Sequence, residues 1–298
     1  FSGKSIGPEL THPYPWDITQ TADSVLWVGT GSPGAGNGGL NRLDPKTGLI
    51  TRYRNDPEDT TTIGQNWVSG ILKDPKDKLW INHTGGVDFF DPETEIFEHV
   101  VKDTSGSGFR GVFIDSRDNI LIQDGARNSW LLLDSKTKAI VKKGKLFGRG
   151  LGVILAYPYF DQKSRIWIAS VNGFGFTSEE YDGLKFWLSY EDFGYPDLEI
   201  RAFSDDDQGN VYFASSEGIF QYHPETGKTV RFGSERGLQS NLFNTKLNNR
   251  GPSGKIYFSG NGGMNVFDPK ELKTNPYPPQ ILIRGITLDG KSYQTYLD

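Results

Sequence analysis

Short runs of three apolar residues recur along the chain at regular intervals. Most runs follow a polar turn and precede small or polar residues, which is typical of short buried β-strands. Their central residues lie 53, 41, 46, 45 and 45 positions apart, so the chain contains six copies of one unit. The runs are Leu26-Trp27-Val28, Leu79-Trp80-Ile81, Ile120-Leu121-Ile122, Ile166-Trp167-Ile168, Val211-Tyr212-Phe213 and Ile256-Tyr257-Phe258.

The segments around these runs also repeat, and they indicate four strands in each unit. Polar turns such as DPKDK at 74–78 and DDDQGN at 205–210 precede the central run. After most runs comes a glycine-containing link, then a further strand and an Asp-Pro turn, as in GGVDFFDPETE at 85–95. We therefore expect strand A before the polar turn, strand B at the run, strand C after the glycine and strand D after the Asp-Pro turn.

Six such units predict an all-β fold, a β-propeller of four-stranded blades. The blades form a six-bladed ring or part of a seven-bladed ring, because stacking in a ring buries both apolar faces of each sheet. We place the propeller at residues 1–279. Residues 280–298 are expected to form a C-terminal strand that closes the ring, or to begin a following domain. The sixth unit has no clear strand D, which the segment from Phe1 would supply unless further blades precede it.

Composition narrows the function classes. No apolar run approaches the roughly 20 residues needed to span a bilayer. The net charge is -5, which argues against nucleic acid as a partner. There is no cysteine, which excludes disulfides and thiolate metal sites.

Several segments resemble two-component regulator propeller repeats. The clearest are DPKDKLWINHTGGVDFFDPETEIFEHV at 74–100 and GGLNRLDPKTGLITRYRNDPEDTTTIGQNWVSGI at 38–71. The segment NGGMNVFDPKELKTNPYPPQILIRGITLDGK at 261–291 resembles the passage from such a propeller into an immunoglobulin-like Y-Y-Y domain. Repeats three and four diverge from the pattern, and the family usually builds seven blades where this chain shows six.

The resemblance implies a ligand-sensing module of a bacterial histidine kinase, often a hybrid one. Such a module lies on the periplasmic or extracellular side of the inner membrane and commonly recognises oligosaccharides. It is not an enzyme and carries no cofactor. Its implied partners are the Y-Y-Y domain, the kinase and, in the parent protein, a second copy of the receptor.

Aligning the six strands A suggests where a ligand would bind. The position 11 residues before the central run residue holds Trp16, Ser69, Arg110, Ala156, Arg201 and Lys246. Strand A is normally innermost in a blade, so this column would lie at one height around the axis. Aromatic faces suit sugar rings, and guanidinium groups suit carboxylate or sulfate. We expect the ligand mouth to include Trp16, Tyr14, Asn66, Trp67, Arg110, Glu199, Arg201, Asn244 and Lys246.

An alternative is that these strand A residues pack between blades, with the arginines paired to carboxylates such as Asp17 and Glu199. The Asp-rich turns are interpreted as hairpin turns rather than calcium sites. The four histidines, His12, His83, His99 and His223, show no metal-ligand spacing and are each interpreted as structural or surface residues. Two further functions stay open: a streptogramin lyase-like propeller enzyme, and a scaffold for protein partners.

Overall fold

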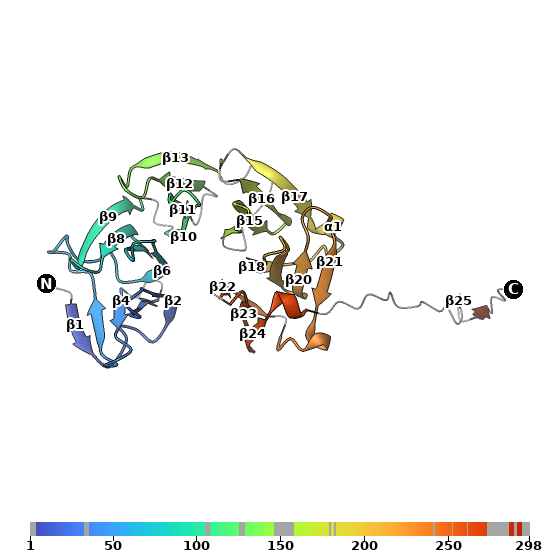
Figure 1. Cartoon of the computed structure of the whole chain (residues 1–298), viewed down its shortest axis with the longest axis horizontal. Helices are drawn as coiled ribbons and strands as arrows, with labels where there is room; N and C mark the ends of the chain where they lie inside the picture. Colours follow the sequence, from blue (N-terminus) through green and yellow to red (C-terminus); the bar gives the residue numbers. More distant parts are fainter. Residues whose placement is uncertain are drawn as a thin grey trace.

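The computed structural model describes most of the chain. The described residues are 4–32, 36–104, 108–124, 129–145, 158–178, 180–181, 183–240, 242–251, 253–260, 262–272, 286–288 and 291–293. Over these residues the fold is a β-propeller of antiparallel sheets, which confirms the predicted class. Figure 1 shows six sheets arranged as an arc, and we number these blades one to six in chain order.

Blades one to three occupy the first half of the chain. Blade one contains β1 (Lys4–Gly7), β2 (Pro15–Gln20), β3 (Leu26–Gly31), β4 (Gly38–Leu43) and β5 (Ile50–Tyr53). Blade two contains β6 (Val68–Lys73), β7 (Leu79–His83), β8 (Gly86–Asp91) and β9 (Ile96–Lys102). Blade three contains β10 (Phe109–Ile114), β11 (Ile120–Asp124), β12 (Ser129–Leu133) and β13 (Ile140–Lys145).

Blades four to six follow the same plan. Blade four contains β14 (Tyr159–Phe160), β15 (Arg165–Ser170), β16 (Gly173–Ser178) and β17 (Leu184–Ser189), and α1 (Tyr190–Phe193) follows it. Blade five contains β18 (Ile200–Asp205), β19 (Val211–Ser215), β20 (Gly218–Tyr222) and β21 (Thr229–Phe232), followed by the 3-10 turn η1 (Ser234–Arg236). Blade six contains β22 (Phe243–Arg250), β23 (Ile256–Gly260) and β24 (Gly263–Phe267), followed by η2 (Pro269–Glu271).

The first predicted strand of each blade faces the inside of the arc. Figure 1 shows β2, β6, β10, β18 and β22 on the inner side, with β9, β13, β17 and β21 outside. Inner strands of neighbouring blades lie against each other, as β2 and β6 do, and likewise β18 and β22. We call β2, β6, β10, β14, β18 and β22 the inner strands.

The central run residues pack each blade against the next one along the chain. Trp27 contacts Phe90 of blade two, with ring centroids 5.4 Å apart. Trp80 shares a buried cluster with Ile120 and Ile122 of blade three. In the same way Trp167 packs on Phe203, and the first five central run residues are all buried. Tyr257 of blade six is half-buried, because no described sheet covers the next face.

The Asp-rich segments are hairpin turns, as predicted. Asp206 Oδ1 accepts hydrogen bonds from the backbone N–H groups of Gln208 at 2.9 Å and Asn210 at 3.0 Å. Asp74 binds the N–H groups of Lys76 and Lys78 in the same way, at 2.8 and 2.9 Å. These carboxylates therefore close the turns between strands A and B.

The recurrent glycine at the start of strand C is required by close packing. Gly86 has a φ of 150°, a region that side-chain-bearing residues rarely adopt. A Cβ atom there would overlap the carbonyl oxygen of Val101 on the neighbouring strand. Gly39, Gly173 and Gly218 stand in the same relation to the outer strands of blades one, four and five.

The two ends of the chain differ from the expected closure. The N-terminal strand β1 pairs with β5 of blade one, so the prediction that it completes blade six is wrong. Blade six has three described strands, and β24 pairs with β23 alone among them. Within 280–298, β25 (Ile286–Leu288) and β26 (Lys291–Tyr293) pair with each other, and the remaining positions lie outside the described residues.

Candidate ligand-binding site

The aligned column of inner-strand residues marks a β-bulge in each blade where it can be followed. The pairing register shifts at Trp16, Ser69, Arg110 and Arg201, which the backbone ladder with the second strand skips. In blade six the shift extends from Phe243 to Asn248 and includes Lys246. Ala156 lies outside the described residues. A bulge bends the strand and re-aims the extra side chain, and bulges occur often beside active and binding sites.

An aromatic pair lies at the bulge of blade one. The Trp16 ring is 38% exposed and lies 5.5 Å from the Trp67 ring, centroid to centroid, at an interplanar angle of 59°. Trp16 Nε1 donates a hydrogen bond of 2.7 Å to the carbonyl oxygen of Gly31, which fixes the indole. Tyr14 is 63% exposed and adds a third ring two residues away. The structure thus brings together two of the predicted aromatic residues, Trp16 and Trp67, while the Tyr14 ring contacts His12.

Asn66 supports this aromatic surface rather than offering a free amide. Its Oδ1 accepts a hydrogen bond of 2.8 Å from the Asn55 N–H, and its Nδ2 donates one of 3.1 Å to the Gly36 carbonyl. Asn66 therefore ties the loop that precedes Trp67 to the β3–β4 loop of blade one.

The predicted charged residues lie on the inner strands of blades three, five and six or next to them. The Arg201 guanidinium forms an ion pair with Glu199 two residues earlier, the kind of pairing that the packing alternative predicts. Both side chains are more than one third exposed, so the pair faces solvent. Arg110, Asn244 and Lys246 are placed on inner strands by their backbones, and their side chains lie outside the described part. Figure 1 shows β18, with Arg201, across the arc from β2.

Blade two contains a cluster of two histidines and an aspartate that was not predicted from the sequence. Asp88, 1% exposed, lies 3.1 Å from His83 Nε2 and 2.8 Å from His99 Nδ1. Burial opposes ionisation of Asp88, but His83, the Gly64 N–H and His99 together hold the pKa of this carboxyl below its usual value. The three residues come from β7, β8 and β9, so no spacing along one element reveals them.

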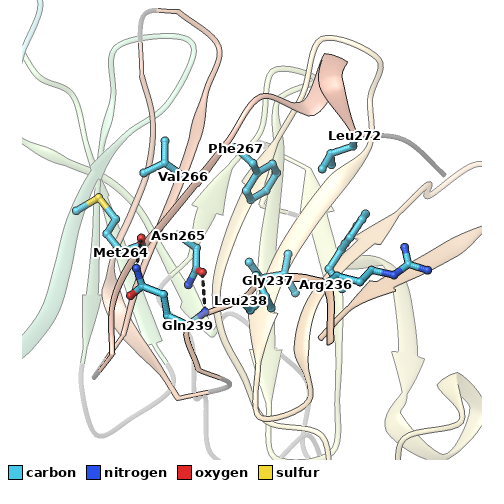
Figure 2. Close-up of a pocket in the computed structure, with 11 residues that line it drawn as sticks. Arg236, Gly237, Leu238, Gln239, Met264, Asn265, Val266, Phe267 and Leu272 are labelled. Atoms are coloured by element: carbon cyan, nitrogen blue, oxygen red, sulfur yellow. Dashed lines mark hydrogen bonds between the residues drawn. The ribbon is translucent and has the colours of Figure 1, made fainter. Parts of the chain in front are cut away.

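A separate apolar pocket of about 310 Å³ lies between blades five and six. Figure 2 shows Phe267 and Leu272 lining it, while Gln239 lies against β24. Gln239 Nε2 donates a 3.2 Å hydrogen bond to the Met264 carbonyl, and its backbone N–H donates another to Asn265 Oδ1. This amide occupies the edge at which the other blades carry an outer strand.

The described part has neither a metal-binding cluster nor a membrane-spanning helix. It contains no group of three or more His, Cys, Asp or Glu side chains arranged to hold a metal ion. It also contains no helix long and apolar enough to cross a membrane; α1 has four residues.

The fold defines the class of protein, a β-propeller. Comparisons with known proteins show which proteins the chain is similar to. No protein-family model matches the chain. It is 25% identical over 271 residues to histidine kinase P4 of Formosa agariphila, covering 91% of this chain and 16% of that protein. The chain thus spans about one sixth of the length of this relative.

Solved structures share the fold at low sequence identity. The extracellular domain of a hybrid two-component system from B. thetaiotaomicron aligns with a TM-score of 0.68 at 17% identity, covering 96% of this chain and 38% of that one. A virginiamycin B lyase from Staphylococcus aureus aligns with a TM-score of 0.62 at 11% identity, covering 91% and 89%.

Gly31→Ala is expected to disturb the aromatic pair. Gly31 has a φ of 139°, and an added Cβ would lie 2.9 Å from Trp67 Cα and 3.0 Å from its Cδ1. We expect Trp67 to move and the free energy of unfolding to fall by about 1–3 kcal/mol. Near-ultraviolet circular dichroism and denaturant unfolding measure the two effects. Gly227→Ala, at a φ of 68° in open space, is the control and should leave the tryptophan signal unchanged.

Proposed function

We propose that the chain is the ligand-sensing propeller of an extracytoplasmic two-component receptor. The observation that carries the proposal is the bulge at one aligned position of blades one, two, three and five. A repeated bulge on the inner strands displays variable side chains on one constant scaffold, which suits recognition. The similarity to a histidine kinase across 91% of the chain supports a signalling role.

The chemistry of the bulge residues favours an oligosaccharide as the ligand. Trp16, Trp67 and Tyr14 offer ring faces on which sugars stack. Arg201 retains guanidinium N–H groups beyond those that one carboxylate can accept, so an acidic sugar can share it with Glu199. Arg110 and Lys246 add positive charge on the same set of strands. The proposed ligand is therefore a glycan with carboxylate or sulfate groups.

The partners follow from the proposed parent protein. A Y-Y-Y domain and a kinase would receive the signal, and two receptor copies would pair. The propeller itself would lie on the periplasmic or extracellular side of the inner membrane, without catalytic activity or cofactor.

The lyase-like alternative is less well supported. The likeness to virginiamycin B lyase rests on the fold, at 11% identity. No histidine occupies the aligned bulge positions of the sequence, and His83 and His99 face Asp88 on the second to fourth strands of blade two.

A glycan array probed with the purified chain tests the proposal. Arg201→Ala should weaken binding of acidic glycans about tenfold, as expected for one charged hydrogen-bonding group, and change neutral glycans by less than about twofold. Arg231→Ala is the matched control, since Arg231 is similarly exposed and also paired, with Glu217 and Glu235, but lies on the outer strand β21. Equal effects of the two substitutions, or no glycan bound, would contradict the proposal.

A further inference from the structure

We infer that Asp88, held between His83 and His99, is a positioning residue for the ligand-binding face. It acts by anchoring the loop of residues 54–67, which joins blades one and two and ends at Asn66 and Trp67. The inference rests on the proposed function, because it assigns a role to the support beneath the aromatic pair.

The anchor is a set of direct contacts. The Gly64 N–H donates a 2.7 Å hydrogen bond to Asp88 Oδ2, and the Phe97 N–H donates one of 3.1 Å to the Thr61 carbonyl. A Cβ added at Gly64 would lie 2.8 Å from His83 Cε1, so the loop backbone rests directly on the imidazole. The loop is thus fixed to blade two three residues before Trp67.

The histidines orient the carboxylate. His83, 3% exposed, accepts a 3.0 Å hydrogen bond at Nδ1 from the Gly85 N–H, and its other ring nitrogen, Nε2, lies 3.1 Å from Asp88 Oδ2. His99 Nδ1 lies 2.8 Å from Asp88 Oδ1, and its other ring nitrogen makes no hydrogen bond within the described residues. Both oxygens of Asp88 are therefore engaged, and one of them holds the loop.

Open space lies beside the anchor on the side of blade two. A pocket of about 290 Å³ lies between the loop and blade two. Asp56 and Asp59 of the loop and Lys102 of β9 also line it, and these are the other charged groups that face the cluster. Ile63 of the loop is fully buried in the core cluster between blades one and two, so release from Asp88 is expected to affect the residues between Ile63 and Trp67.

Acid is expected to release the anchor when Asp88 is protonated. The pKa of Asp88 is held below its ordinary value, so its contribution to stability is present above that value and is lost as the pH falls through the lowered one. The anchor is therefore expected to hold at neutral and mildly acidic pH.

Hydrogen exchange of Asp88→Asn tests the inference without a ligand. Amides of residues 61–67 should exchange about tenfold faster than in the unmodified chain, because a hydrogen bond to a charged group is lost. The circular dichroism contributed by the Trp16–Trp67 pair, obtained by subtracting the spectrum of Trp67→Phe, should shrink. Gly64→Ala should give the same changes by pushing the loop off His83, and the double variant should add little.

Asp206→Asn is the matched control. Asp206 is a buried aspartate with four hydrogen bonds in blade five, remote from both tryptophans. It should leave exchange in 61–67 and the tryptophan signal unchanged. Unaltered exchange in Asp88→Asn, or equal changes in both variants, would overturn the positioning role. Faster loop exchange with unchanged glycan affinity would instead count against the proposed ligand face.

Discussion

Trp80→Ala is expected to lower the free energy of unfolding by about 3–5 kcal/mol, the usual cost of emptying a large aromatic core site. Trp80 has no exposed surface and fills the interface between blades two and three, where Ile120, Ile122 and Leu133 surround it. Equilibrium denaturation with urea measures the loss. A loss below about 1 kcal/mol would mean that the central run residues do not hold the blades together.

Two conservative substitutions separate packing from hydrogen bonding at these positions. Trp80 Nε1 is buried and has no hydrogen-bond partner among the described residues, so Trp80→Phe removes volume alone. Trp167 Nε1 donates a 2.7 Å hydrogen bond to Oδ2 of the buried Asp161, so Trp167→Phe also removes one of the two hydrogen bonds to this oxygen, the other coming from Arg165 Nε. We therefore expect Trp167→Phe to be the more destabilising of the two.

Gly86→Ala is expected to cost about 3 kcal/mol or more, the second large effect. The backbone φ of 150° excludes a side chain, and the new Cβ would overlap the carbonyl oxygen of Val101. Because that oxygen belongs to the backbone of a packed strand, it cannot rotate away. Thermal or urea unfolding of the variant measures the cost.

Gly48→Ala provides the comparison. Gly48 has a φ of 70° and no atom within 4 Å of an added Cβ, so only the backbone conformation is penalised, by about 1–2 kcal/mol. If the two variants lose equal stability, the recurrent glycine serves the turn conformation and not the approach of the outer strand.

The sequence was sufficient for the architecture because the blade is a local pattern. A buried triplet such as Leu79-Trp80-Ile81, an Asp-closed turn before it and a glycine after it are all encoded within one unit. The alignment of inner strands also found the special position, since Trp16, Ser69 and Arg201 share one offset. It did not show that this position is a bulge, because a bulge is a shift in pairing between two strands.

What the sequence did not predict depends on contacts between separate strands. His83, Asp88 and His99 meet only when three strands pair, and the two histidines were each interpreted alone as structural or surface residues. The same holds for β1, which pairs with β5 within blade one instead of joining the last blade. The pairing of Arg201 with Glu199, by contrast, was one of the alternatives that the sequence offered.

The inner-strand bulge also determines how such a protein can diversify. A bulged residue has no partner across the ladder, so its replacement leaves the register of the sheet intact. Within this one chain the position already holds an indole, a hydroxyl and two guanidinium groups, at Trp16, Ser69, Arg110 and Arg201. Duplicated genes could thus acquire new specificities through a few substitutions at one site per blade, while the strand register of each blade is inherited unchanged.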